Sequence, residues 1–214
     1  MYIPKHFEES RVEVLHELMH THPLATVVTL SDNGLNANHI PLILSPSPAP
    51  FGLLQGHVSR KNPVLSEVQQ RSEVLAIFQG PNCYITPSWY ATKHETGQVV
   101  PTWNYAVVHV YGSVRIVDDT SWLLSHLEAL TNQHESTFAE PWKVSDAPQE
   151  YIERLLPSIV GIEIVITRLS GKYKMSQNQV AQNRAGVIAG LHTRGDENSL
   201  AIARMVAAAA KIQD

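Results

Sequence analysis

The chain has 214 residues, of which 43% are hydrophobic and 17% charged, with a formal net charge of −4. This composition excludes a disordered chain, and the acidic balance argues against a general electrostatic attraction to nucleic acid. No apolar run approaches the roughly 20 residues that span a bilayer, and the start, MYIPKHFEES, lacks the apolar segment of a signal peptide. We therefore expect a cytoplasmic protein with no membrane partner. The single cysteine, Cys83, excludes an intrachain disulfide framework.

The first third of the sequence changes from helical to strand periodicity. Apolar residues at helical spacing predict a helix over residues 8–19, which Pro23 prevents from continuing. The segment ATVVTL, the turn SDNG and the segment LNANHIPLIL then predict two strands joined by a turn. A loop, SPSPAPFG, leads to a third strand, LLQGHVS, and to a short helix that begins at Asn62 with Pro63 in its first turn.

The remaining sequence predicts further strands and four helices. The segments VLAIFQG and CYITPSWY are expected as separate strands, and a loop, ATKHETGQ, precedes a long strand region at residues 99–119. Helical patterns begin at Thr120 and cover Gln149–Leu156, IVGIEIVITRLSGKYKM returns to strand, and NQVAQNRAGVIAGL and NSLAIARMVAAAAK are helical. Strands joined mostly by short turns predict an antiparallel barrel or sandwich, and we assign the chain to the α+β class with a β-barrel core.

Residues 16–20, HELMH, match the zinc-protease motif, in which two histidines one helical turn apart bind the metal. A zinc protease also needs a third ligand further along the chain, and the helix here ends almost at once at Thr21–Pro23. On a helical wheel both histidines lie beside or opposite the apolar stripe. We interpret them as surface residues and predict no metal site.

The segment GHVSRKNP places Ser59, Arg60 and Lys61 between a strand and the start of a helix. A hydroxyl, backbone N–H groups and two cations at such a position suit a phosphate group. A cationic turn at the end of a strand is also a common surface feature, so the pattern supports two interpretations.

The segment from Trp89 to Tyr111 is rich in aromatic residues that could wall a flat cofactor. Strand alternation sends Trp103 and Tyr105 to one face and Asn104 to the other. These faces could equally be a barrel core and an oligomer interface. Asn104 is the more informative polar residue, because a buried amide needs hydrogen-bond partners.

Polar residues also follow the last strand, in SGKYKMSQNQ, where they could cover a ligand or could cap the next helix. From Arg168 onward, the sequence contains seven Lys and Arg residues and only three Asp and Glu residues. This basic excess could meet an anion or nucleic acid, or could be a solvated helix face.

Seven segments together resemble one family, the PaiB-type proteins, which are described as FMN-binding negative transcriptional regulators. They are MYIPKHF, NHIPL, GHVSRKNP, FQGPNCYITPSWY, VVPTWNYAVVHVYG, IVGIEI and GKYKMSQN, in this order, and the likeness runs from Met1 to about Leu191. The resemblance implies an antiparallel six-stranded split β-barrel, similar to pyridoxamine phosphate oxidase, that works as a homodimer with FMN at the subunit interface. It also implies a barrel domain over residues 1–165 and a C-terminal strand and helical extension over residues 166–214.

The resemblance also assigns residues to the cofactor. Ser59, Arg60 and Lys61, after His57, are expected to hold the FMN phosphate. Asn38 and His39 are expected on a strand under the flavin ring. Trp103, Asn104 and Tyr105 are expected at the ring or its ribityl chain.

Three functions are compatible with these observations. The first is a flavin-dependent regulator with a DNA or protein partner, although no helix-turn-helix pattern is visible. The second is an FMN-dependent oxidoreductase. No catalytic acid or base can be named in the sequence, but this does not exclude an enzyme, because the flavin itself supplies the redox chemistry. The third is a cofactor-free or haem-handling barrel in which His39, His57 and His109 have roles other than FMN binding.

Overall fold

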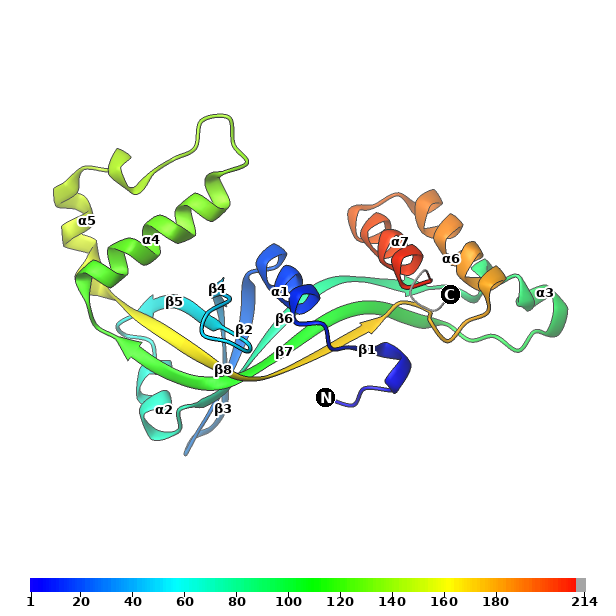
Figure 1. Cartoon of the computed structure of the whole chain (residues 1–214), viewed down its shortest axis with the longest axis horizontal. Helices are drawn as coiled ribbons and strands as arrows, with labels where there is room; N and C mark the ends of the chain where they lie inside the picture. The colour runs from blue at the N-terminus through cyan, green and yellow to red at the C-terminus, as the bar shows by residue number, and fades with distance from the viewer. Residues whose placement is uncertain (211–214) are drawn as a thin grey trace. The chain divides into compact units, whose positions relative to one another are not determined.

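The computed structural model describes residues 1–210 (Figure 1), so Lys211, the end of the last predicted helix, lies outside the described residues. By their contacts, the residues form two compact units that are discontinuous in sequence. The barrel unit contains Met19–Phe78 and His109–Leu169, and the terminal unit contains Met1–Leu18, Gln79–Val108 and the chain from Ser170. The division at residues 165 and 166 stays a prediction.

An eight-stranded sheet forms the framework, rather than the six strands expected. Its order is β3-β2-β6-β7-β8-β5-β4, and β1 pairs with β8. The strands are β1 (Glu8–Glu9), β2 (Leu24–Ser31), β3 (Gly34–Pro41), β4 (Ile43–Ser45), β5 (Leu53–Ser59), β6 (Glu73–Ile85), β7 (Thr102–Val117) and β8 (Ile159–Lys174). The pairs with a defined register are antiparallel, such as Leu53↔Val165 to Ser59↔Ile159. The long strands β6, β7 and β8 each contribute residues to both units.

Within the barrel unit the sheet curves until β3 comes close to β5, although the two are not neighbours in the strand order. Gly56 permits this approach, because a Cβ there would lie 2.6 Å from Cδ2 of Leu42 and 3.2 Å from the carbonyl oxygen of Pro41. Alternate residues point inward and form an apolar core that includes Val27, Ile40, Leu54, Phe78, Val110, Ile162 and Ile164. The curved antiparallel sheet and flanking helices confirm the predicted α+β split-barrel class.

Three α-helices lie wholly within the barrel unit. They are α2 (Val64–Gln70), α4 (Thr120–Glu135) and α5 (Gln149–Leu155). Asp119 caps α4, since its Oδ1 accepts a hydrogen bond from the backbone N–H of Trp122 at 2.7 Å. This cap fixes the start of the helix that carries Trp122 and His126.

The terminal unit contains α3 (Thr92–Thr96), α6 (Ala181–Arg194) and α7 (Glu197–Ala210), and helix α1 (Val12–Thr21) begins in it. Helices α6 and α7 pack side by side (Figure 1). Gly195 links them with φ +73°, a left-handed conformation that favours glycine at a helix end. Gly186 and Gly190 let α6 lie directly on Trp89, since a Cβ at either would meet that residue.

Several predicted boundaries were wrong. Residues 8–9 form β1 rather than the first helical turn, because they pair with Gly171 and Lys172 of β8. The segments VLAIFQG and CYITPSWY belong largely to one strand, β6, and LNANHIPLIL divides into β3 and β4. Long-range strand pairing, which single-sequence periodicity does not report, decides each of these boundaries.

The Gly56→Val substitution should destabilise the fold by about 1–3 kcal/mol, because the added side chain overpacks the contact with Leu42. Urea unfolding measures the change. Leu35→Ala is the control, since Leu35 is 77% exposed and its truncation should change stability by less than about 0.5 kcal/mol. Equal stability of Gly56→Val and the native chain would contradict the close approach.

Candidate functional site

The Ser59–Lys61 turn is fixed by backbone bonds at the end of β5. The N–H of Arg60 donates to the carbonyl of Ser158 at 2.9 Å, and the N–H of Asn62 donates to that of Ser59 at 2.8 Å. Ser59 Oγ accepts from the N–H of Lys61 at 3.3 Å. Oδ1 of Asn62 accepts from the N–H of Val64 at 3.0 Å, which supplies α2 with a side-chain cap. The turn therefore presents its side chains from a defined backbone.

Arg60 is already engaged with protein groups. Its two Nη atoms donate to both carboxylate oxygens of Asp118, at 2.7 and 2.8 Å. Its Nε donates to the carbonyl of Pro157 at 3.0 Å, and Nη2 donates to that of Ile159 at 3.1 Å. The hydrogen bonds from Arg60 lower the pKa of the Asp118 carboxyl. Arg60 thus fastens the turn to the segments before α4 and β8.

Lys61 differs from its neighbour. Its side chain is exposed, and no carboxylate among residues 1–210 forms an ion pair with it. Lys61 and the Ser59 hydroxyl are therefore available to an anion such as the phosphate of FMN, whereas Arg60 would first have to release bonds to Asp118.

Asn38 and His39 lie on opposite faces of β3, as alternation requires. His39 is exposed. Oδ1 of Asn38 accepts from Nδ2 of Asn62 at 2.9 Å, which joins β3 to the segment after the turn. The Nδ2 atom of Asn38 is buried, and no partner for it is found within the described chain. An unsatisfied donor beside the Ser59–Lys61 turn fits an anionic or oxygen-rich group in this region.

His57 belongs to a buried polar network that sequence analysis did not identify. Its Nδ1 lies 3.2 Å from Nε2 of His126, and the ring of His126 stacks on Trp122 at 5.1 Å with an interplanar angle of 13°. Burial lowers the pKa of His57, and burial together with His57 lowers the pKa of His126 to about 4. Both histidines are therefore neutral at pH 7.

Glu163 is the charged centre of the same network. Its side chain accepts hydrogen bonds from Gln55 at 3.0 Å, from Nε1 of Trp122 at 3.0 Å and from Arg115. Burial raises the pKa of Glu163, but the hydrogen bonds from Arg115, Gln55 and Trp122 outweigh it and bring the pKa below its ordinary value. The available signal was a glutamate inside the apolar strand IVGIEI.

In the terminal unit, the predicted alternation of β7 is confirmed. Trp103 is 52% exposed and meets Tyr84 edge to face at 6.0 Å, and Tyr105 lies under the ammonium group of Lys172 at 5.4 Å. Asn104 faces inward, is fully buried, and its Nδ2 donates to Ser176 Oγ at 2.9 Å. The expected partner of the buried amide thus comes from the SQN segment.

Trp103, Asn104 and Tyr105 belong to the terminal unit, whereas Asn38, His39, His57 and the Ser59–Lys61 turn belong to the barrel unit. Each group is therefore considered by itself, and its role in FMN binding stays a prediction.

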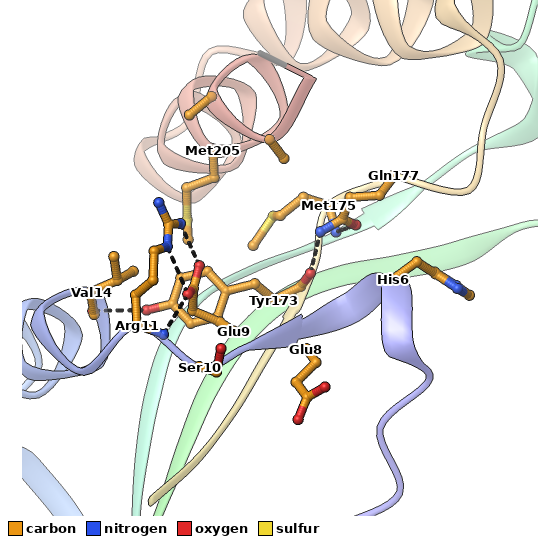
Figure 2. Close-up of a pocket in the computed structure, with 12 residues that line it drawn as sticks. His6, Glu8, Glu9, Ser10, Arg11, Val14, Tyr173, Met175, Gln177 and Met205 are labelled. Atoms are coloured by element: carbon orange, nitrogen blue, oxygen red, sulfur yellow. Dashed lines mark hydrogen bonds and ion pairs between the residues drawn. The ribbon is translucent and has the colours of Figure 1, made fainter. Parts of the chain in front are cut away.

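The terminal unit also holds a cavity of about 520 Å³ that no sequence motif indicated (Figure 2). Val14, Met175 and Met205 supply apolar surface, and the ion pair of Glu9 and Arg11 lies at its edge. The volume is within the range of small-molecule sites. Burial, together with Glu9, raises the pKa of the Tyr173 hydroxyl, which donates to the carbonyl of Val14 at 3.2 Å.

The HELMH histidines take no part in a metal cluster that the structure describes: within residues 1–210, no three His, Cys, Asp or Glu side chains are placed to hold an ion. No helix in the same range is long and apolar enough to cross a membrane.

Comparison with known proteins supports the fold and names the family. A solved structure of the FAD and haem binding protein from Mycobacterium smegmatis matches with a TM-score of 0.58 at 16% identity, covering 78% of this chain and 73% of the other. The likeness shows that the two proteins share the split-barrel fold. The family model described as "Putative FMN-binding domain" matches residues 1–168, and the chain belongs to this family. The expected FMN cofactor is confirmed at this level.

Two relatives match over nearly their whole length. Protein AN0679 of Emericella nidulans is 35% identical over 249 aligned positions, covering 100% of this chain and 99% of the relative. The Bacillus subtilis "Protease synthase and sporulation protein PAI 2" is 29% identical, covering 96% of both. The predicted PaiB-type resemblance is confirmed by this second match.

The His126 pKa predicts a pH-dependent stability. An unfolded chain has a histidine pKa near 6.5 and the folded chain one of about 4, so between these values only the unfolded state binds the proton. Stability should therefore fall by about 2 kcal/mol, after allowance for screening by solvent, as the pH drops from 6.5 to 4. Urea unfolding across this range measures it.

The His126→Gln variant should lose most of that slope, while His134→Gln, an exposed substitution on the same helix, should keep it. Equal slopes in the native chain and His126→Gln would refute the assignment. Carboxyl groups contribute mainly below this range.

Proposed function

We propose that the protein binds FMN as a homodimer and acts as a flavin-dependent negative regulator of transcription. The PAI 2 relative supports the regulatory part, because its name refers to protease synthesis and sporulation and the likeness covers 96% of both chains. The family supports the flavin. Bound FMN supplies one- and two-electron redox chemistry, so a change in its redox state can serve as the signal.

The observation that carries the proposal is the pre-formed Ser59–Lys61 turn. Lys61 provides a free ammonium group and Ser59 a hydroxyl, both on a backbone held by Arg60 through Asp118, Pro157 and Ile159. We assign the FMN phosphate to this turn, with Lys61 in direct contact and Arg60 as the residue that positions it. A donor set that is ordered before binding loses less entropy when the ligand arrives.

Nδ2 of Asn38, for which residues 1–210 offer no partner, adds a donor that ribityl or phosphate oxygens can accept. In the terminal unit, Trp103 and Tyr84 expose two aromatic rings that meet edge to face on the outer face of β6 and β7. An exposed apolar patch of this kind suits either a flavin ring or a second copy of the chain. It supports the homodimer part of the proposal.

An FMN-dependent oxidoreductase is the second candidate. Lys172 lies over Tyr105 on the same strand face as Trp103, and a cation beside an aromatic surface would stabilise the negative charge of a reduced flavin. Consumption of NADH or NADPH by the FMN-loaded protein, without salt-dependent DNA binding, would favour this candidate over the regulator.

The phosphate assignment predicts a ligand-specific defect. Lys61→Ala should weaken FMN binding about tenfold, through loss of one charge-assisted hydrogen bond, and should leave riboflavin binding unchanged, because riboflavin has no phosphate. Quenching of flavin fluorescence on titration measures both constants. The matched control, Lys93→Ala, removes an exposed lysine from the terminal unit and should change neither.

The variant Asp118→Asn distinguishes the role of Arg60 from that of Lys61. If Arg60 only positions the turn, then replacing its ion pair with Asp118 by a weaker hydrogen bond to asparagine should reduce FMN affinity slightly. A gain in FMN affinity would show instead that Asp118 competes with phosphate for Arg60. If Lys61→Ala lost the same affinity for riboflavin as for FMN, the assignment of the phosphate to this turn would be wrong.

The regulatory part has its own measurement. Fluorescence anisotropy with the DNA upstream of the protein's own gene, at two salt concentrations, should show binding that differs between oxidised and reduced FMN. Equal DNA binding in both redox states, or none, contradicts the regulator while leaving FMN binding intact.

A further inference from the structure

A small polar pocket of about 120 Å³ lies in the terminal unit, at the end of β8. Nine residues line it: Tyr90, Val100, Pro101, Thr102, Asn104, Lys174, Ser176, Asn178 and Gln179. They include one lysine and no acidic residue. The lining therefore carries a positive charge and mostly neutral donor groups, and this composition favours an anion.

Lys174 is the cationic group of the pocket. It donates to Thr102 Oγ1 and, at 2.9 Å, to the carbonyl of Trp103, both of them neutral acceptors. Across the described residues, no carboxylate forms an ion pair with it. Burial, and then repulsion from Lys172, lowers its pKa. A half-buried ammonium group without a counter-ion is costly, and a bound anion would offset that cost.

Two further side chains of the lining, those of Ser176 and Tyr90, are buried and carry hydroxyl groups. Ser176 has φ +60°, the only positive φ of a non-glycine residue in residues 1–210, and it is buried against Asn104 by the two hydrogen bonds at 2.9 and 3.3 Å. Such strain persists where the surroundings impose it, and it often marks a binding site. Tyr90 is 3% exposed, and burial raises the pKa of its hydroxyl, which therefore stays a neutral donor.

We propose that this pocket binds a small oxyanion, a phosphate or carboxylate group, with the ammonium group of Lys174 as the charge partner and the Tyr90, Asn104 and Ser176 side chains as hydrogen-bonding groups. The volume accommodates one such group, whereas the 520 Å³ cavity is sized for a larger molecule. The anion has two chemical sources, a free ion or metabolite and the phosphate of FMN itself. The inference does not depend on the regulatory role, and its test separates it from the Ser59–Lys61 assignment.

The first measurement is a calorimetric titration of the full chain, free of FMN, with inorganic phosphate and with acetate. Saturable binding of at least one of them is expected in the native chain. Lys174→Gln should weaken it roughly tenfold or more, because a charged donor is lost. Lys93→Gln, which removes an exposed lysine of the terminal unit outside the lining, is the control and should keep binding within about threefold.

A second variant guards against a folding defect. Ser176→Gly keeps the left-handed backbone but removes the hydroxyl, so it should weaken anion binding. Relief of backbone strain offsets part of the cost of leaving Nδ2 of Asn104 without its partner, and a cooperative thermal transition checks that the variant is folded. A direct readout is acetylation of Lys174 by acetic anhydride near pH 7, followed by mass spectrometry. Saturating phosphate should slow the reaction at Lys174 and leave that at Lys93 unaltered.

FMN and riboflavin distinguish the two sources. If FMN displaces phosphate, and Lys174→Gln weakens FMN but not riboflavin, the pocket holds the FMN phosphate and the Ser59–Lys61 assignment fails. If phosphate and FMN bind together, the pocket takes a free anion. Absence of saturable phosphate and acetate binding, or equal binding by the native chain and Lys174→Gln, would overturn the oxyanion site whatever the fate of the FMN proposal.

Discussion

The buried carboxylate of Glu163 is the interaction on which the barrel unit depends. It lies in β8 and is 5% exposed, and its partners come from β5, β7 and α4 through Gln55, Arg115 and Trp122. A buried carboxylate without these donors would cost several kcal/mol, so the three elements have to meet at this point for the unit to fold. Gly161 completes the arrangement, because a Cβ there would lie 2.7 Å from Cε3 of Trp122. The network thus fixes where α4 lies on the sheet.

The position of α4 in turn fixes the neutral histidine pair. The ring of His126 stacks on that of Trp122, and Nε2 of His126 lies within hydrogen-bonding distance of Nδ1 of His57 on β5. The strand that carries His57 continues into the Ser59–Lys61 turn, and Arg60 ties that turn to Asp118, just before α4. One buried charge therefore supports, through a few contacts, the geometry of a cationic turn at the surface.

The sequence predicts what depends on short-range periodicity and misses what depends on distant contacts. Alternation along β7 correctly predicted that Trp103 and Asn104 lie on opposite faces, but it did not say which face is buried. Once Asn104 is known to be buried, the need for a hydrogen-bond partner follows. The same approach could not find Glu163, Trp122 and His126 as a group, since they meet only through tertiary packing. It also treated Ser59, Arg60 and Lys61 as equivalent donors. Asp118, 58 residues beyond Arg60, makes them different. The HELMH motif shows that a short local match does not establish a site, because any helix with two histidines one turn apart has this spacing.

Cations in this chain can be separated by how their charge is compensated. Arg115, Arg60 and Arg11 each bind a carboxylate, and their charges have structural roles in networks. Within residues 1–210, Lys61 and Lys174 bind none, and each stands beside groups that can donate to an oxyanion: the hydroxyl of Ser59 in one unit, and Asn104 with Ser176 in the other. Folding alone gives little reason to leave a half-buried lysine such as Lys174 without a counter-charge, because an alanine or glutamine would avoid the cost of desolvation. A bound anion removes that cost, and this is the physical reason to look for an oxyanion at Lys174. At the exposed Lys61 the reason is instead the ordered turn that carries it.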